Sequence, residues 1–269
     1  MQKLSKYWFL FILVMILSCG DYNKVFKSKD ASLKYKKAME LYSKKDYIRA
    51  VGLFDQLRDI YKNSDSLETV YYHTAMCYYQ LKDFQYASMF FKDFTENFTK
   101  SFRLVECAYM SLYCDYLNIG SFELDQSDTK EVMAAMQTFT NYYPESSYTQ
   151  KINEHLDDLR AKLQQKEYAH VIQYYKMGEF KAAVTSSKNT VKLFPDIKER
   201  EELEFIAVKC QYIYAMNSIE KKRRERLEEV VTNFEDYKYN NDKTSVHYSE
   251  AEDYKIKAEK EIKLLKELL

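Results

Sequence analysis

Two kinds of hydrophobic pattern follow one another along the chain. Residues 7–17 (YWFLFILVMIL) form an unbroken apolar run, and Lys3 and Lys6 precede it. From residue 31 onward, apolar residues instead recur at helical spacing among charged and polar ones. The first run is shorter than the roughly 20 apolar residues that span a bilayer, and it has the length and flanks of a signal-peptide core. The pattern therefore predicts an export signal followed by a helical protein.

The helical part repeats itself. In four places a small or short apolar residue is followed eleven residues later by an aromatic one. Ala38 and Ala75 lie twelve residues before the first two of these small residues. Small side chains at both places let two antiparallel helices approach closely, and stacked pairs bury the apolar face that one pair leaves open. The four spaced pairs are Ala50 and Tyr61, Ala87 and Phe98, Val132 and Tyr143, and Ala183 and Phe194.

This alternation of small and aromatic residues resembles the tetratricopeptide (TPR) repeat. The strict repeat is about 34 residues long, whereas the small residues here step by 37, 45 and 51, so we expect longer helices or inserted loops. The whole chain has only four glycines and two prolines, which strands and tight turns use heavily. The expected fold is therefore all-α, a TPR-like α-solenoid of about five helix pairs with a C-terminal capping helix.

The end of the array carries the remaining predicted elements. A fifth helix pair is expected from Glu201 to Phe234, and polar stretches predict loops at residues 118–128 and 236–249. Residues 250–269 form the expected cap. An alternative is a free helix that awaits a partner. The apolar face of this helix consists of Ala258, Ile262, Leu265 and Leu269.

The apolar run at the N-terminus ends in residues 16–20 (ILSCG), which resemble a bacterial lipobox. In such proteins the cysteine is lipidated and becomes the new N-terminus, so Cys19 is the predicted membrane anchor. The alternative is an ordinary signal peptide with a chance cysteine. Gly20 replaces the aspartate that favours inner-membrane retention, so we expect an outer-membrane protein that faces the periplasm. The predicted division is a signal peptide at 1–18, a lipidated N-terminus and flexible tether at 19–30, and a TPR-like helical domain at 31–269.

The charge balance excludes one class of partner. Cleavage before Cys19 removes two lysines and leaves 39 basic and 41 acidic residues. A nucleic-acid-binding protein would instead need an excess of basic residues on one surface. Cleavage also removes Trp8, the single tryptophan. The remaining cysteines sit in apolar helical contexts, and two of them, seven residues apart on one helix, lie too far apart to be bridged. We expect four buried free thiols, at Cys77, Cys107, Cys114 and Cys210.

No catalytic or metal-binding constellation is visible, so we expect neither enzymatic activity nor a cofactor. The four histidines are scattered, and the few glycines exclude a phosphate-binding loop. Paired tyrosines on predicted first helices are more suggestive, because tyrosine is enriched in binding hot spots. Any of these side chains has the alternative of an ordinary core position. The candidate partner-binding residues are Tyr71, Tyr72, Tyr79, Tyr174 and Tyr175.

Taken together, these features resemble the BamD family, the TPR lipoproteins of the machinery that inserts β-barrels into the outer membrane. The resemblance covers nearly the whole chain, although the first two repeats lack the closing proline and the region after Phe234 diverges. Besides the lipobox and the five irregular repeats, three segments carry it. These are residues 124–129 (LDQSDT), 141–148 (NYYPESSY) and, most specifically, 166–180 (KEYAHVIQYYKMGEF).

The resemblance implies a non-enzymatic scaffold that binds the barrel-forming, BamA-like subunit and unfolded barrel precursors. Residues 31–100 would then face the precursors, and residues 165–235 would dock the barrel-forming subunit. Two alternatives stay open: a periplasmic TPR lipoprotein of envelope maintenance or cell division, and a carbohydrate-binding surface lipoprotein. The absence of tryptophan from the mature chain argues against the second.

Overall fold

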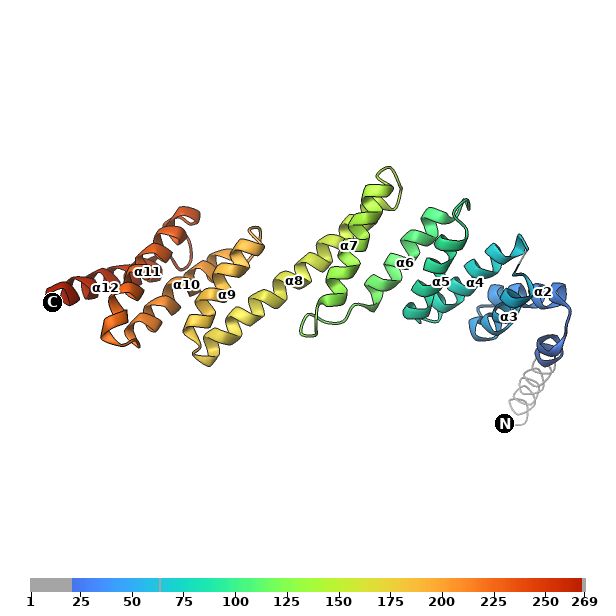
Figure 1. The fold of residues 1–269 in the computed structure, drawn as a ribbon, viewed down its shortest axis with the longest axis horizontal. Coiled ribbons are helices and arrows are strands. Elements are labelled where there is room, and N and C mark those ends of the chain that lie inside the picture. The colour runs from blue at the N-terminus through green and yellow to red at the C-terminus, as the bar shows by residue number, and fades with distance from the viewer. Residues whose placement is uncertain (1–20, 63, 268–269) are drawn as a thin grey trace, which may run out of the picture. The chain divides into compact units, whose positions relative to one another are not determined.

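The computed structural model describes residues 21–62 and 64–267, and within them it contains helices and no strand (Figure 1). A short helical stretch at residues 21–27 comes first. The longer helices are α2 (Ala31–Ser43), α3 (Tyr47–Ile60), α4 (Ser66–Gln80), α5 (Phe84–Asn97), α6 (Leu104–Asn118), α7 (Ser127–Tyr142), α8 (Thr149–Met177), α9 (Phe180–Leu193), α10 (Arg200–Met216), α11 (Glu220–Asn240) and α12 (Tyr248–Glu267).

Helices α2 to α11 follow one another as five pairs, and α12 is the additional helix at the end. The all-α, TPR-like prediction of five pairs and a C-terminal helix is confirmed. The chain divides into two compact units. Unit 1 holds residues up to Gly120 together with Ser127–Leu156, and unit 2 holds Ser121–Gln126 together with Asp157–Leu269. Helix α8 therefore begins in unit 1 and ends in unit 2.

In three of the helix pairs, the turn between the two helices contains a residue with a positive φ angle. Lys45, Lys82 and Gly178 adopt positive φ angles of 62°, 61° and 77° between the first and second helix. Only glycine reaches this left-handed region without steric cost, so the two lysines are held there by the helices on either side. After both lysines an aspartate caps the next helix: Asp46 accepts a hydrogen bond from the Arg49 backbone N–H, and Asp83 accepts one from that of Tyr86.

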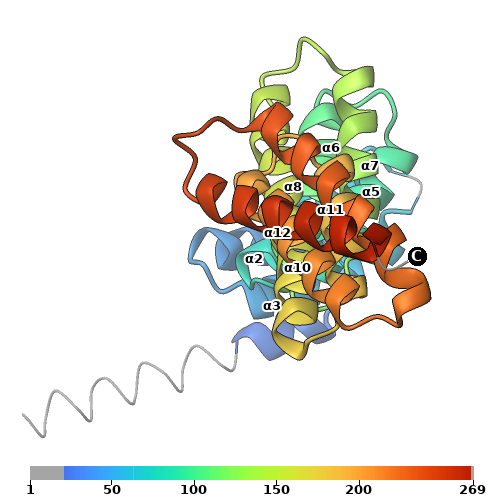
Figure 2. The ribbon, with the colours of Figure 1, turned by 90° about the vertical axis from the view of Figure 1, so that its left-hand side faces the viewer.

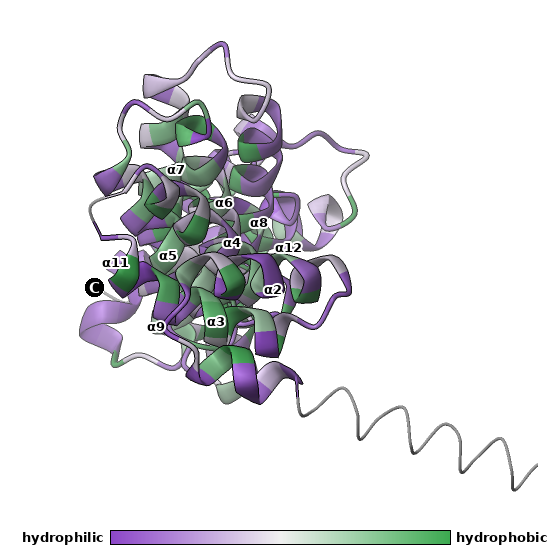
Figure 3. Cartoon of the chain, turned by 90° about the vertical axis from the view of Figure 1, so that its right-hand side faces the viewer, coloured by the Kyte–Doolittle hydropathy of each residue, from purple (hydrophilic) through white to green (hydrophobic). Residues whose placement is uncertain are grey.

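The predicted small positions are fully buried where they are alanines, whereas Val132 in the third repeat is only half-buried. Ala38, Ala50, Ala75, Ala87 and Ala183 each have no exposed surface, as close helix approach requires. Helices α2 and α3, nearest the viewer in Figure 3, carry apolar and polar positions side by side, as amphipathic helices do. The largest completely buried side chains of unit 1 are aromatic and aliphatic: Phe54, Phe91, Phe94, Leu53, Leu57, Met136 and Ile152.

In unit 2 the last helix covers its predecessors. Helix α12 packs on α10 and α11, and Figure 2 shows it lying across them. Ala258 is buried, and Ile262 and Leu265 pack against the same core, so the predicted apolar face of the cap is confirmed for these three residues. Leu269, the fourth predicted member, lies outside the described residues, as do Cys19 and the signal peptide.

Two expectations from polar composition are wrong. Residues 21–27, expected to belong to a flexible tether, are helical, and Val25 is only 5% exposed in the core of the first repeat. Residues 236–240, expected to open a loop, instead form the last turn of α11, where Tyr237 is fully buried. In both segments an apolar side chain, Val25 or Tyr237, is buried in the core although its sequence neighbours are mostly polar. The loop predicted at 118–128 is present between α6 and α7.

The prediction of buried free thiols is confirmed. Cys77, Cys107, Cys114 and Cys210 are each completely buried and unbridged. Burial raises the pKa of each of these thiols to about 12, so all four stay protonated at neutral pH.

A polar cluster under the cap makes the stability of unit 2 depend on pH. Glu201 accepts hydrogen bonds from the Tyr237 hydroxyl (2.6 Å), from the His247 backbone N–H (3.0 Å) and from the His247 ring (2.8 Å). Burial alone would raise the pKa of Glu201, but the bonds from Tyr237 and His247 outweigh it and hold that pKa below its usual value. The carboxylate thus stabilises the folded state above its unfolded pKa, and the contribution is lost as pH falls through the folded pKa.

Replacing Glu201 by glutamine should therefore lower the free energy of unfolding by about 1–2 kcal/mol at pH 7. Urea unfolding at pH 7 and at decreasing pH measures the effect, and the gap to the parent chain should close as Glu201 protonates. Glu252→Gln, an exposed carboxylate on α12, is the matched control. A gap that is absent at pH 7, or that widens in acid, would contradict the assigned role of this carboxylate.

Candidate functional site

The tyrosines predicted to bind partners are mostly packed into the repeats. In unit 1 the Tyr71 ring packs edge-on against Phe90 and Phe98. Tyr72 donates a hydrogen bond to Glu106 (2.8 Å), and the Arg103 guanidinium lies 4.1 Å from the centre of its ring. Burial and the Glu106 carboxylate both raise the pKa of the Tyr72 hydroxyl, which therefore stays a hydrogen-bond donor.

The other three predicted tyrosines lie apart from this pair. Tyr79 packs against Phe84 and Tyr113. On α8, Tyr175 belongs to the core of unit 2, whereas Tyr174 is 40% exposed. None of the five lines the groove between α9 and α11 in unit 2, so their role in binding stays a prediction.

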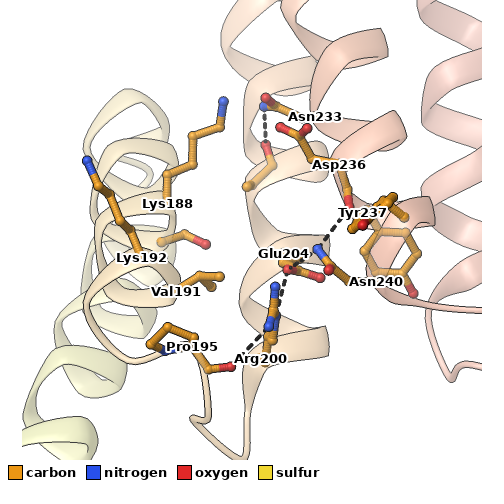
Figure 4. Close-up of a pocket in the computed structure, with 13 residues that line it drawn as sticks. Lys188, Val191, Lys192, Pro195, Arg200, Glu204, Asn233, Asp236, Tyr237 and Asn240 are labelled. Carbon is orange, nitrogen blue, oxygen red and sulfur yellow. Dashed lines mark hydrogen bonds and ion pairs between the residues drawn. The ribbon is translucent and has the colours of Figure 1, made fainter.

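That groove lies between α9 and α11, with α10 as its floor (Figure 4). It encloses a cavity of about 470 Å³. Its wall on α9 presents Lys188, Val191 and Lys192, and its opposite wall is the C-terminal half of α11. We call this cavity the α9–α11 groove. Its lining residues are Ser187, Lys188, Val191, Lys192, Pro195, Arg200, Glu204, Ala207, Asn233, Asp236, Tyr237, Tyr239 and Asn240.

One carboxylate ties the floor of the groove to its walls. Glu204 accepts hydrogen bonds from Arg200 Nε and Asn240 Nδ2, both at 2.9 Å, and from Asn241 Nδ2 at 2.7 Å. Arg200 Nη1 also donates to the Pro195 carbonyl oxygen at 3.0 Å. These bonds connect the end of α9, the start of α10 and the end of α11. They therefore shape the groove without leaving Arg200 or Glu204 available to a ligand.

A buried acceptor without a partner faces the groove. Asn233 is 3% exposed, and its Nδ2 donates to the Ala207 carbonyl oxygen at 3.3 Å. Its Oδ1 has no hydrogen-bond donor among the described residues. An unsatisfied buried acceptor costs about 1–3 kcal/mol. Lys188 and Lys192 stand across the groove from Asn233 and Asp236 in Figure 4. Both lysines are exposed, and neither forms an ion pair within the described chain.

A second depression of about 530 Å³ continues the groove toward the start of α9. Lys188 lines both cavities. On the floor, Gln211 donates a hydrogen bond to the Arg226 carbonyl oxygen, and the Arg226 guanidinium lies 4.0 Å from the centre of the Tyr214 ring. The two depressions together form a long surface with polar groups and apolar patches. This geometry suits an extended polypeptide segment better than a small compact substrate.

The lining of the two depressions is rich in lysine, acidic and amide side chains. The residues that line either depression include no histidine and no cysteine. Across residues 21–62 and 64–267, no three acidic, histidine or cysteine side chains come together as a metal site would require. Nor does any helix in this part of the chain combine the length and apolar character that crossing a bilayer demands.

Sequence reasoning missed the far wall of the groove. Asp236, Tyr237, Tyr239 and Asn240 fell in a predicted loop, whereas they continue α11 by another turn. A signal was present, because Val230, Phe234 and Tyr237 follow helical spacing and are buried together. Two asparagines and two aspartates within residues 236–242 favoured the loop prediction instead.

Comparison with known proteins identifies the family. The model of the YfiO family, described as an outer membrane lipoprotein, matches residues 27–227. This match spans 201 of the 269 residues and includes parts of both units. A search of curated proteins finds no match. The chain belongs to the YfiO family of outer membrane lipoproteins.

Proposed function

We propose that the chain is a lipid-anchored scaffold of the β-barrel assembly machinery, in the manner of BamD. It is anchored through Cys19 and faces the periplasm. The observation that carries the proposal is the match to an outer membrane lipoprotein family over three quarters of the chain. The five TPR-like helix pairs support it, because arrays of this kind present extended binding surfaces.

In this proposal the two ends of the array have different partners. The repeats within residues 31–100 engage unfolded barrel precursors. The repeats within residues 165–235 dock the large barrel-forming subunit, and the α9–α11 groove supplies the contact there. The match to a family of outer membrane lipoproteins supports a role as a non-enzymatic scaffold.

The chemistry of the groove defines the segment that fits it. Lys188 and Lys192 suit a carboxylate on that segment, because neither is neutralised within the described chain. Val191 and Pro195 add apolar surface between these polar groups. An extended, acidic stretch of the barrel-forming subunit meets both requirements.

Reversing the charge of the α9 wall should weaken this docking. Lys188→Glu with Lys192→Glu is expected to reduce affinity for the barrel-forming subunit roughly tenfold, because two attractive contacts become repulsive. Surface-immobilised subunit and a dilution series of each variant measure the change. Lys260→Glu with Lys263→Glu on α12 carries the same charge change as a control. Equal affinities for both double variants would remove the groove from the docking surface.

Depletion in the cell tests the function as a whole. Loss of the chain should lower the amounts of many unrelated outer-membrane barrel proteins together. A defect confined to septation, with barrel proteins at normal levels, would contradict the proposal and favour a division role.

A further inference from the structure

The helix at residues 21–27 is built into the first repeat. Val25 lies in the same core cluster as Ala38, Leu41 and Ala50. The buried Lys34 donates from Nζ to the Phe26 carbonyl oxygen at 3.0 Å, and Lys37 forms an ion pair with Asp21 at 2.9 Å. An apolar contact and two polar contacts to α2 therefore hold this short helix, which we call the anchor helix.

A glycine in α3 makes room for the anchor helix. Gly52 lies in the middle of α3, where glycine destabilises a helix by about 1 kcal/mol relative to alanine. A Cβ atom at this position would lie 3.0 Å from the Tyr22 hydroxyl and 3.7 Å from the Phe26 ring. One turn earlier, the Arg49 guanidinium lies 5.9 Å from the centre of the Tyr22 ring. The close approach of the anchor helix thus explains why a glycine occupies position 52 in the middle of α3.

The docked helix shortens the link to the proposed lipid. Cys19 precedes Asp21 by two residues, and two residues of chain span about 7 Å at most. A flexible tether over residues 19–30 would instead have a root-mean-square length of about 20 Å. With the anchor helix docked, the part of unit 1 that begins at Asp21 stays about one headgroup layer from the lipidated residue, because that layer is roughly 5–8 Å deep in each leaflet.

The outward face of the anchor helix is basic. Tyr22, Val25 and Phe26 face the protein, and at 100° per residue Lys24 and Lys27 lie on the opposite side of the helix. Lys29 follows directly. These three lysines are exposed, and none forms an ion pair within the described chain. The acidic residues of the segment are engaged: Asp21 pairs with Lys37, and Asp30 caps α2 by accepting from the Leu33 N–H. Three lysines without an ion pair in the described chain thus lie next to the anchor, and Asp30 is the one acidic side chain of the segment whose charge no cation pairs with.

We propose that Lys24, Lys27 and Lys29 form a phospholipid-facing surface that binds anionic headgroups and orients unit 1 on the membrane. The orientation rests on the proposed lipidation of Cys19, and it does not depend on the role in barrel assembly. Each lysine near an anionic surface strengthens binding about fivefold, so three contribute about 100-fold. A lipid alone fixes only where the chain is attached. The rigid basic helix also fixes which side of unit 1 meets the membrane.

Vesicle flotation measures the headgroup contact separately from the lipid. The mature chain with Cys19→Ser is mixed at low salt with phosphatidylcholine vesicles that contain or lack phosphatidylglycerol. We expect binding to the anionic vesicles only, and about 100-fold weaker binding after Lys24→Gln, Lys27→Gln and Lys29→Gln. The control replaces Lys260, Lys263 and Lys266 of α12, which are equally exposed, and should bind like the parent. Equal loss in both triple variants, or binding unchanged by the first, would overturn the proposal.

A spin label then tests the geometry in the lipidated chain. Asn23 is exposed on the anchor helix, and the four native thiols in the described chain are buried, so Asn23→Cys provides a selectively labelled position. In vesicles that contain no assembly partner, the label should sit at headgroup depth and have restricted motion. A mobile, water-exposed label would contradict a docked anchor helix at the membrane. Because no assembly partner is present, a contradictory label measurement would not bear on the scaffold function. Failure of the partner-binding assay would likewise not bear on the label measurement.

Discussion

Replacing Cys19 by serine is expected to abolish membrane attachment through a lipid. The thiol is the only group at this position that can carry the thioether-linked lipid, and a serine leaves the mature chain either released or held as an uncleaved precursor. Each buried methylene contributes about 0.8 kcal/mol, so one acyl chain holds only marginally while two or three hold effectively permanently. The expected change is therefore nearly complete. Membrane fractionation and labelling with a radioactive fatty acid measure it.

The control for this experiment changes a buried thiol of the folded part. Cys210→Ser leaves the lipobox intact, so fatty-acid incorporation should be the same as in the parent chain. Unchanged labelling of the Cys19→Ser variant would contradict the anchor assignment. It would also remove the reason to place the anchor helix at the membrane.

Truncating Phe91 to alanine should produce the largest loss of stability in unit 1. Phe91 is fully buried on α5, in a cluster with Ala87, Phe94 and Cys107. Removing its ring forfeits the transfer energy and leaves a cavity between α4, α5 and α6, at a cost of about 3–5 kcal/mol. Thermal or urea unfolding followed by circular dichroism measures the difference.

An exposed phenylalanine in the same unit provides the matched comparison. Phe102 is 85% exposed between α5 and α6, so Phe102→Ala should change stability by about 0.5 kcal/mol at most. Similar losses for Phe91→Ala and Phe102→Ala would contradict the packing assigned to the second repeat.

Much of the fold follows from local patterns. The paired small residues, such as Ala75 and Ala87, predicted where helices touch, and both are completely buried. The turns before Asp46 and Asp83 are also built locally, because each aspartate caps the helix that follows it through a residue three positions ahead. Repetition strengthened these signals, since the same contact recurs in each pair.

The parts that escaped prediction depend on contacts between distant segments. The anchor helix is polar over most of its length, and it is ordered because Gly52, some thirty residues later, leaves space for Tyr22. The α9–α11 groove combines three helices, and the unpaired oxygen of Asn233 is visible only once its neighbours are placed. The predicted tyrosines illustrate the same limit. Their spacing marked them as prominent, but packing decides whether a ring such as Tyr71 faces a partner or the core.

The central claim is that this YfiO-family chain is a scaffold of the β-barrel assembly machinery. The most direct test solubilises membranes gently, captures the full chain through a C-terminal tag and identifies the proteins that co-purify. The account predicts that the large barrel-forming subunit is recovered in stoichiometric amount. A capture that retains the tagged chain with its lipid but lacks this subunit would contradict the account.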